Sequence, residues 1–104
     1  MRPLSLRDYK HILDYYTIPY VGKPSEWIYE RAEHILGTKL CRCIKKVTKH
    51  DGIGEPGAIG ICTNSIFAKR NLKYYLFSCK KKYRLKPYPK KKRSLQKTQR
   101  RIQI

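Results

Sequence analysis

The chain has 104 residues and a formal net charge of +18, with 25 Lys and Arg against only 7 Asp and Glu. This length allows one small domain with a tail, and no apolar run approaches the roughly 20 residues that would cross a bilayer. All seven acids lie in the first 55 residues, whereas residues 56–104 carry 15 Lys and Arg and no acid. Such an excess opposes folding by self-repulsion and is typical of proteins that bind a polyanion.

The first predicted element is a helix from about Ser5 to Tyr16. Ser5 is a suitable N-cap, and Asp8 stands three residues later as its partner in a shortened capping box. The i, i+3, i+4, i+7 spacing of one buried face is met by Tyr9, Ile12, Leu13 and Tyr16. An extended loop over residues 17–23 follows.

A second, longer helix is predicted from Pro24 or Ser25 to about Thr48. At about 100° per residue, one apolar stripe contains Ile28, Ala32, Ile35, Leu36, Leu40, Cys43 and Val47. Gly37 lies in the middle of this helix and is expected to weaken it.

The second half of the chain reads as β-structure and a tail. After a loop at residues 50–57, the β-branched and apolar residues 58–67 predict a strand, and residues 74–83 predict its partner. From residue 86 the polar, basic composition predicts no fixed structure. The expected fold is α+β, with one domain at 1–85 (a helical part at 4–48 and a β-hairpin at 58–85) and a flexible basic tail at 86–104.

Residues 4–36 carry a pattern with the spacing of a known DNA-binding unit. The pattern starts with the apolar pair Leu4-x-Leu6, followed by Tyr9-Lys10-x-Ile12-Leu13 in the first helix. Ile18-Pro19 and Gly22 lie in the loop, and Glu26-Trp27-Ile28 belongs to the second helix. This order resembles the SAP motif, a helix–extended loop–helix unit. Three positions depart from the family pattern: Tyr9 replaces a usual Leu, Thr17 a common Gly, and Pro24 a frequent Lys. The resemblance implies DNA contacts from Lys10, Gly22, Lys23 and Arg31.

The whole chain also resembles small basic proteins of nucleocytoplasmic large DNA viruses. The similarity lies in residues 32–36 (AEHIL), 39–47 (KLCRCIKKV) and 58–63 (AIGICT). It implies a viral origin and a role linked to the virion or to DNA.

The four cysteines are candidate ligands of a structural zinc ion. A tetrahedral site would take Cys41, Cys43, Cys62 and Cys79. On a continuous helix the first two point about 200° apart, so both ligate only if the helix ends near Leu40. Plain buried or surface thiols are the alternative. Because the N-terminus lacks the apolar stretch of a signal peptide, an intracellular protein is expected, and disulfides are not.

The remaining cations form the larger part of the predicted nucleic-acid site. They are Lys69, Arg70, Lys73, Lys80, Lys81, Lys82, Arg84, Lys90, Lys91, Lys92 and Arg93. Residues 89–93 (PKKKR) also match a basic nuclear-import signal. Tyr83 and Tyr88, interleaved with these cations, either stack on unpaired bases or are ordinary strand residues.

These patterns predict a non-enzymatic nucleic-acid-binding protein, with DNA preferred and little sequence selectivity, in viral genome packaging or transcription. One alternative is a small cementing or minor capsid protein of the virion, with other virion proteins as partners, and a second is an RNA-binding protein. The virion or the host nucleus is the expected location, the import machinery is a further candidate partner, and a membrane is not expected. An enzyme is not expected, because the sequence has no phosphate-binding Gly loop and the basic half has no carboxylate that could act as a base.

Overall fold

The computed structural model describes residues 3–80, 82–87 and 93–103, and it confirms the α+β class. The helices in these ranges are α1 (Leu6–Tyr15), α2 (Ser25–His50), α3 (Glu55–Ile66) and a short 3-10 turn, η1 (Ala68–Arg70). The strands are β1 (Leu72–Tyr74), β2 (Leu76–Ser78), β3 (Arg84–Lys86) and β4 (Leu95–Lys97). Within the described part of the chain, no helix is long and apolar enough to cross a membrane.

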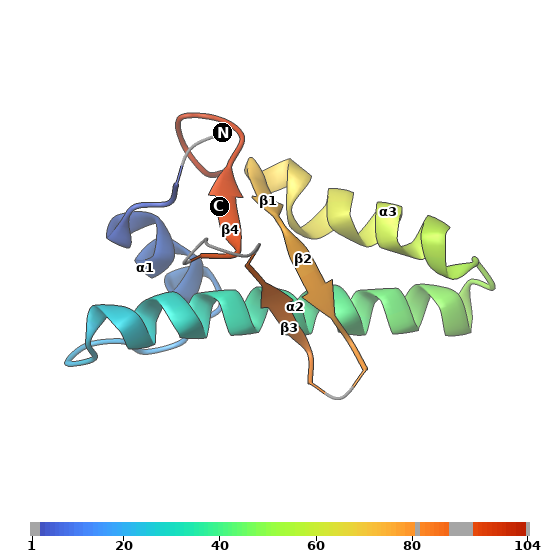
Figure 1. Cartoon of the computed structure of the whole chain (residues 1–104), viewed down its shortest axis with the longest axis horizontal. Coiled ribbons are helices and arrows are strands. Elements are labelled where there is room, and N and C mark those ends of the chain that lie inside the picture. The colour runs from blue at the N-terminus through green and yellow to red at the C-terminus, as the bar shows by residue number, and fades with distance from the viewer. Residues whose placement is uncertain (1–2, 81, 88–92, 104) are drawn as a thin grey trace.

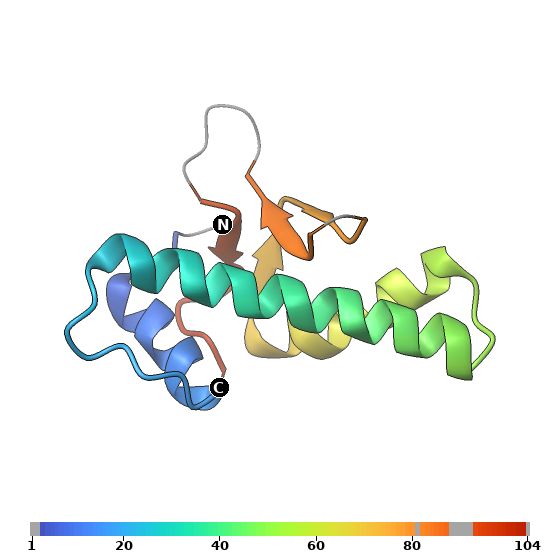
Figure 2. The same cartoon turned by 90° about the horizontal axis from the view of Figure 1, so that it is seen from below.

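The long helix α2 is the axis of the fold (Figure 1). Its 26 residues measure about 39 Å, close to the 42 Å long dimension of the molecule. Helix α1 packs along its first half, α3 runs beside its second half, and the strands cross its middle (Figures 1 and 2). The position of every other helix therefore depends on α2.

Helix α1 begins as the sequence predicts. The backbone N–H of Asp8 donates to Ser5 Oγ at 3.2 Å, and the N–H of Ser5 donates to Asp8 Oδ2 at 2.9 Å, which completes the capping box. The predicted apolar face is buried at Tyr9, Ile12 and Leu13, each 2% exposed or less. From α2, the same core receives Ile28, Ala32, Leu36, Leu40 and Ile44.

Two residues of the loop between α1 and α2 have left-handed backbone conformations. Gly22 has φ of 81° and Thr17 has φ of 55°. Glycine adopts such angles freely, but a β-branched residue is strained there. Thr17 therefore occupies, at some cost, a conformation that favours the Gly common at this position of the SAP pattern.

The prediction of a strand at residues 58–67 is wrong, because most of this segment lies in α3. Gly54 in extended conformation and Pro56 in the first turn start the helix. Ala58 and Cys62, one helical turn apart, are fully buried beside α2. In so short an apolar run, β-branched content alone does not separate a strand from a buried helix.

The β-hairpin accordingly lies later in the chain than predicted. β2 pairs with β3 and β1 pairs with β4, both antiparallel, so the described strands form two separate two-stranded ladders. The predicted strand at 74–83 is interrupted at Tyr75, whose backbone N–H donates to the Ser94 carbonyl at 3.0 Å. Its partners thus come from the C-terminal part of the chain and not from residues 58–67.

The prediction of an unstructured tail from residue 86 is also wrong for residues 93–103. Strand β4 lies in this segment, and Leu95 and Ile102, 2% and 8% exposed, belong to the main hydrophobic core. Two isolated apolar residues among cations show no periodic pattern, so only their burial in the folded chain reveals them as core. Residues 88–92 lie outside the described residues.

Gly37 serves close packing where the strands cross α2. A Cβ atom at this position would lie 2.9 Å from the Cα of Arg84 and from the backbone N of Leu85 in β3. Such distances are too short for a stable contact, so only glycine lets β3 approach the helix this closely. The helix continues through Gly37, although glycine costs roughly 1 kcal/mol in a helix interior.

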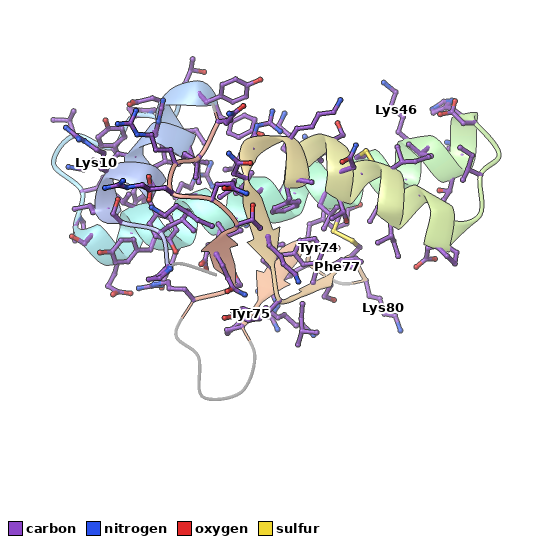
Figure 3. All side chains as sticks on the ribbon, turned by 90° about the horizontal axis from the view of Figure 1, so that it is seen from above. Lys10, Lys46, Tyr74, Tyr75, Phe77 and Lys80 are labelled. Carbon is purple, nitrogen blue, oxygen red and sulfur yellow. A yellow bond between two sulfur atoms is a disulfide. The ribbon has the colours of Figure 1, made fainter. Side chains whose placement is uncertain are left out.

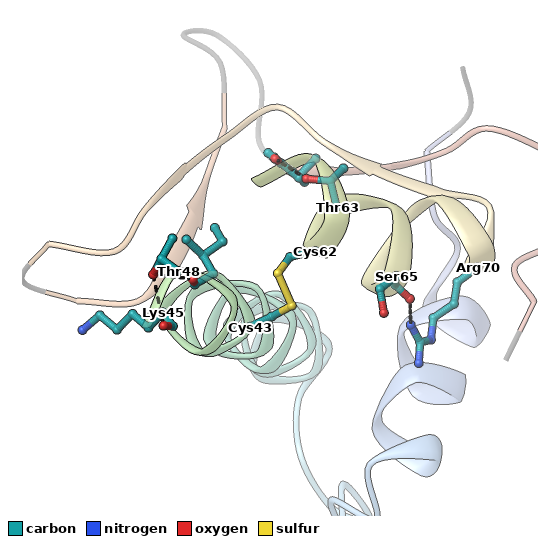
Figure 4. Close-up of a disulfide and its surroundings, with 9 residues drawn as sticks. Cys43, Lys45, Thr48, Cys62, Thr63, Ser65 and Arg70 are labelled. Carbon is teal, nitrogen blue, oxygen red and sulfur yellow. Dashed lines mark hydrogen bonds between the residues drawn. A yellow bond between two sulfur atoms is a disulfide. The ribbon is translucent and has the colours of Figure 1, made fainter. Parts of the chain in front are cut away.

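The cysteines form disulfides and do not form the predicted zinc site. Cys41 is bonded to Cys79, and Cys43 is bonded to Cys62 (Figure 4). Because α2 continues to His50, Cys41 and Cys43 point about 200° apart, toward the hairpin and toward α3 respectively. The expectation of free thiols is therefore also wrong. Among the described residues, no group of three or more His, Cys, Asp or Glu could hold a metal ion.

Candidate nucleic-acid interface

The charged side chains of α2 are sorted onto two sides of the helix. At about 100° per residue, the acids Glu26, Glu30 and Glu33 fall within a sector of about 60°. The cations fall within about 120° on the other side. They are all exposed, and we call them the cationic face of α2: Arg31, Lys39, Arg42, Lys45, Lys46 and Lys49.

Two of the three acids on the acidic side of α2, Glu26 and Glu33, bind the C-terminal segment, and Glu30 is exposed. Glu26 receives two hydrogen bonds of 2.8 Å from the Arg93 guanidinium, and Arg93 also lies over the Tyr29 ring, 4.3 Å from its centroid. Glu33 accepts from the Ser94 backbone N–H at 3.1 Å. These contacts hold the residues just before β4 beside the first half of α2.

A further ion pair joins the same segment to α1. Lys97 Nζ lies 2.8 Å from Asp8 Oδ2, and both side chains are largely buried, 13% and 15% exposed. Burial acts to raise the pKa of Asp8, but the hydrogen bonds from Lys97 and Ser5 outweigh it and hold that pKa below its usual 3.8. Asp8 therefore stays charged and stabilises the fold at neutral pH.

Glu33 has the opposite shift. Desolvation by burial raises the pKa of its carboxyl above 4.5, although the Ser94 backbone hydrogen bond and the nearby Arg93 charge act to lower it. Burial, together with the Glu33 charge, also raises the pKa of the Tyr9 hydroxyl, which lies 3.5 Å from Glu33 Oε2. Glu33 thus belongs to a partly buried polar network with the Tyr9 hydroxyl and the Ser94 backbone.

Three of the four SAP-like candidates, Lys10, Gly22 and Lys23, lie toward the loop end of the molecule, whereas Arg31 belongs to the cationic face of α2. Lys10 Nζ lies 5.8 Å from the Tyr20 ring centroid, and Lys23 Nζ lies 5.2 Å from the Trp27 ring centroid. Gly22 lies in the turn between them. In Figure 3, Lys10 is at the opposite end of the molecule from Lys46, so the SAP-like candidates and the second half of α2 are separate basic regions.

The predicted hairpin cations come together with the cationic face. Arg42 lines a cleft of about 430 Å³ with Lys82 and Arg84. Arg31 lines a second cleft of about 470 Å³ with the same Arg84, but Glu30 and Glu33 line this cleft as well, so its charge is mixed. Lys80 is exposed at the end of the hairpin (Figure 3). The hairpin therefore extends the basic surface sideways from α2.

Two of the predicted cations have contacts within the fold. Arg93 binds Glu26, and Arg70 donates to the carbonyl oxygens of Ser65 and Ile66 at 3.0 and 2.9 Å. Both are therefore partly structural. Lys69 and Lys73 are exposed. Four further candidates, Lys81, Lys90, Lys91 and Lys92, lie outside the described residues.

Sequence reasoning missed the larger part of the cationic face as a site. Lys39, Arg42, Lys46 and Lys49 follow one another at i, i+3, i+7 and i+10, which is the spacing of one side of a helix. The signal was present once the helix was predicted to reach Thr48. The pattern is hidden in the overall charge because the first 55 residues also contain all seven acids, so their net charge is small.

Comparison of the chain with protein-family models, with curated proteins and with solved structures gave no match. The SAP-like and viral resemblances therefore rest on the residues quoted for them.

Proposed function

We propose that the protein binds nucleic acid, with duplex DNA preferred, through phosphate contacts made by the cationic face of α2 and the neighbouring hairpin cations. Such contacts gain free energy from released counterions and carry little sequence information. In a virus, this activity suits genome packaging or transcription.

The observation that carries this proposal is the sorting of charge around α2. A merely soluble surface mixes both signs, but here Glu26 and Glu33 bind the C-terminal segment and no acid of α2 falls within the cationic face. From Lys39 to Lys49 the cations cover about 15 Å of helix axis. Over the same length, one DNA strand presents four or five phosphates at about 3.4 Å of axis each.

The SAP-like loop end is a second proposed contact, through Lys10, Gly22 and Lys23. The left-handed φ values of Thr17 and Gly22 support the loop comparison. Because this end lies far from Lys46 along α2 (Figure 3), the two basic regions would contact different stretches of a duplex. Replacing Lys10 and Lys23 by Ala should weaken duplex binding less than changes on the cationic face, because fewer charges are removed.

The direct test is binding of labelled duplex DNA, single-stranded DNA and double-stranded RNA of equal length over a salt series. The triple variant Lys39→Gln, Arg42→Gln, Lys46→Gln should flatten the slope of log affinity against log salt on duplex DNA by about 2 to 3, because each lost phosphate contact contributes roughly 0.9.

A matched triple variant, Arg7→Gln, Arg100→Gln, Arg101→Gln, removes the same charge from exposed residues away from the cationic face. Equal effects of the two triples would show that only total charge matters and would reject the cationic face as the site. Stronger binding of double-stranded RNA would favour the RNA-binding alternative, and no binding to any of the three would overturn the proposal.

A structural role in the virion is the second candidate, and the two disulfides favour it. Disulfides persist at virion surfaces and in other oxidising surroundings and are rare in reducing compartments. A fixed copy number in purified particles that survives nuclease treatment would support this role, whereas loss of the protein with the genome would support the nucleic-acid role.

A further inference from the structure

A groove of about 470 Å³ lies between the end of α1, the middle of α2 and the end of α3. Its aromatic part is formed by Tyr15 and Tyr16, whose rings meet edge to face with centroids 4.9 Å apart. Its basic part is formed by Lys39, Arg42, Lys46 and Arg70. None of the described residues that line it carries a carboxylate. The groove therefore combines aromatic surface with positive charge alone.

Arg70 is held in place before any ligand arrives. Its Nη1 donates to the carbonyl oxygens of Ser65 and Ile66, at the end of α3, with distances of 3.0 and 2.9 Å (Figure 4). Its guanidinium lies 5.1 Å from the Tyr15 ring centroid. Because these contacts leave the charge beside the groove, little conformational entropy would be lost when an anion binds.

The Cys43–Cys62 disulfide sets the width of the groove. Cys43 lines it from α2, and its bond to Cys62 attaches α3. Figure 4 shows this bond between the two helices, with Arg70 on the α3 side. The basic side chains on α2 and the guanidinium of Arg70 are thus kept at a constant separation by a covalent link.

Tyr15 accepts a hydrogen bond of 3.4 Å from Arg70 at its hydroxyl, but much of its ring is still exposed. Tyr15 is 52% exposed, although Tyr9 on the same helix is buried. An aromatic ring among cations stacks on unpaired bases while the cations contact the phosphates. Contact with the phosphates of a duplex needs only the positive side chains and gives the aromatic ring no role. The volume also lies in the range of roughly 300–1,000 Å³ that is usual for small-ligand sites.

We propose that this groove binds an unpaired nucleotide of a single-stranded segment, with the base against Tyr15 and the phosphate beside Lys39, Arg42 and Arg70. This inference rests on the proposed nucleic-acid function and adds the strand state that the groove selects. A protein of this kind binds the junctions and melted segments of DNA as well as the duplex.

The test is the variant Tyr15→Ala, assayed with an oligothymidylate and with a blunt duplex of equal length. Single-strand affinity should fall about 5- to 150-fold, because a base–aromatic stack contributes roughly 1–3 kcal/mol, while duplex affinity should stay nearly constant. Tyr15→Phe keeps the ring and should keep single-strand affinity. Tyr20→Ala is the matched control, since Tyr20 also lies beside a lysine but outside the groove. Thermal unfolding confirms that each variant is folded.

The outcomes separate this inference from the proposed function. Equal losses on single strand and duplex, or no loss on either with the wild type still binding both, would overturn the stacking role and leave the proposed function standing. Thymidine monophosphate that competes as strongly as the oligonucleotide would assign the groove to free nucleotides instead. A wild type that binds neither nucleic acid would overturn the proposed function itself.

Discussion

The two halves of α2 are held to the rest of the protein by different chemistry. Along the first half, polar contacts attach the C-terminal segment: Glu26 binds Arg93, Glu33 binds the Ser94 backbone, and Asp8 of α1 binds Lys97. Along the second half, two disulfides attach the hairpin and α3. The first half uses Glu26 and Glu33 in these contacts, whereas the disulfides of the second half need no charged side chain.

This difference explains why the exposed cations concentrate in the second half. An ion pair that holds two elements together neutralises the cation that a partner would need. Where Cys41 and Cys43 provide the links, Lys39, Arg42 and Lys46 remain exposed without a carboxylate nearby. The disulfides therefore allow a strongly basic surface on a small domain that self-repulsion would otherwise destabilise.

Removing the disulfides should have the largest effect, and it acts on the second half. The pairs are 38 and 19 residues apart, so loop-closure entropy predicts losses of about 4 kcal/mol for Cys41→Ala with Cys79→Ala and about 3 kcal/mol for Cys43→Ala with Cys62→Ala. Chemical denaturation under oxidising conditions measures both. In excess reductant, the variants and the wild type should have nearly equal free energies of unfolding. A wild-type midpoint that reductant does not change would contradict the covalent links.

Changing Gly37 acts where the two halves meet. Gly37→Ala should lower the free energy of unfolding by about 1–3 kcal/mol, because the added methyl overpacks against the β3 backbone. Gly60→Ala in α3 is the matched control: a Cβ there meets nothing within 4 Å, so helix propensity should raise stability by up to about 1 kcal/mol. Urea denaturation compares them, and equal responses would show that β3 does not lie against Gly37.

Changing Asp8 tests the polar attachment of the first half. Asp8→Asn removes the charge that binds Lys97 and weakens the capping box, and should cost about 1 kcal/mol at neutral pH. Because the folded-state pKa of Asp8 is below its usual 3.8, the wild-type advantage is present above that pH and is lost as pH falls through the folded value. Denaturation at a series of pH values should therefore show the two proteins converging in acid. A stability difference that persists at acid pH would show that the substitution acts through the shape of the side chain and not through its charge.

Changing Glu33 should have the smallest effect and the opposite pH dependence. Its pKa is raised above 4.5 by burial, so the folded state takes up its proton first and this group favours folding increasingly as pH falls from the raised value toward 4.5. Glu33→Gln keeps an acceptor for the Ser94 N–H and should lack that gain. Glu30→Gln on the exposed side is the control. Identical pH profiles of the wild type and the Glu33 variant would show that this carboxyl is not desolvated.

The parts of the fold that sequence predicts are those set by neighbours along the chain. The Ser5–Asp8 capping box and the apolar face of α1 involve residues at most one or two turns apart. The same holds for the course of α2 from residue 25 to near residue 50. The cationic face is also readable from spacing once that helix is known. The charge patterns that led to the candidate site are thus local properties of the sequence.

Other features depend on contacts between distant residues. The segment at 58–67 was predicted as a strand because its composition suits both a strand and a buried helix, and packing beside α2 decides for the helix. The cysteines were assigned as thiols or zinc ligands because sequence does not show which of them meet. Leu95 and Ile102 looked like parts of a tail because two apolar residues do not mark a core.

By itself, then, the sequence determined the two N-terminal helices, the α+β class and the basic character of the surface, because these follow from local spacing and composition. Only the tertiary structure decided the Cys41–Cys79 link across 38 residues, the Glu26–Arg93 contact across 67, and the meeting of Tyr15 with Arg70 across 55. Such contacts form when separate elements pack on α2, and each depends on the combined burial of many side chains that no local pattern records.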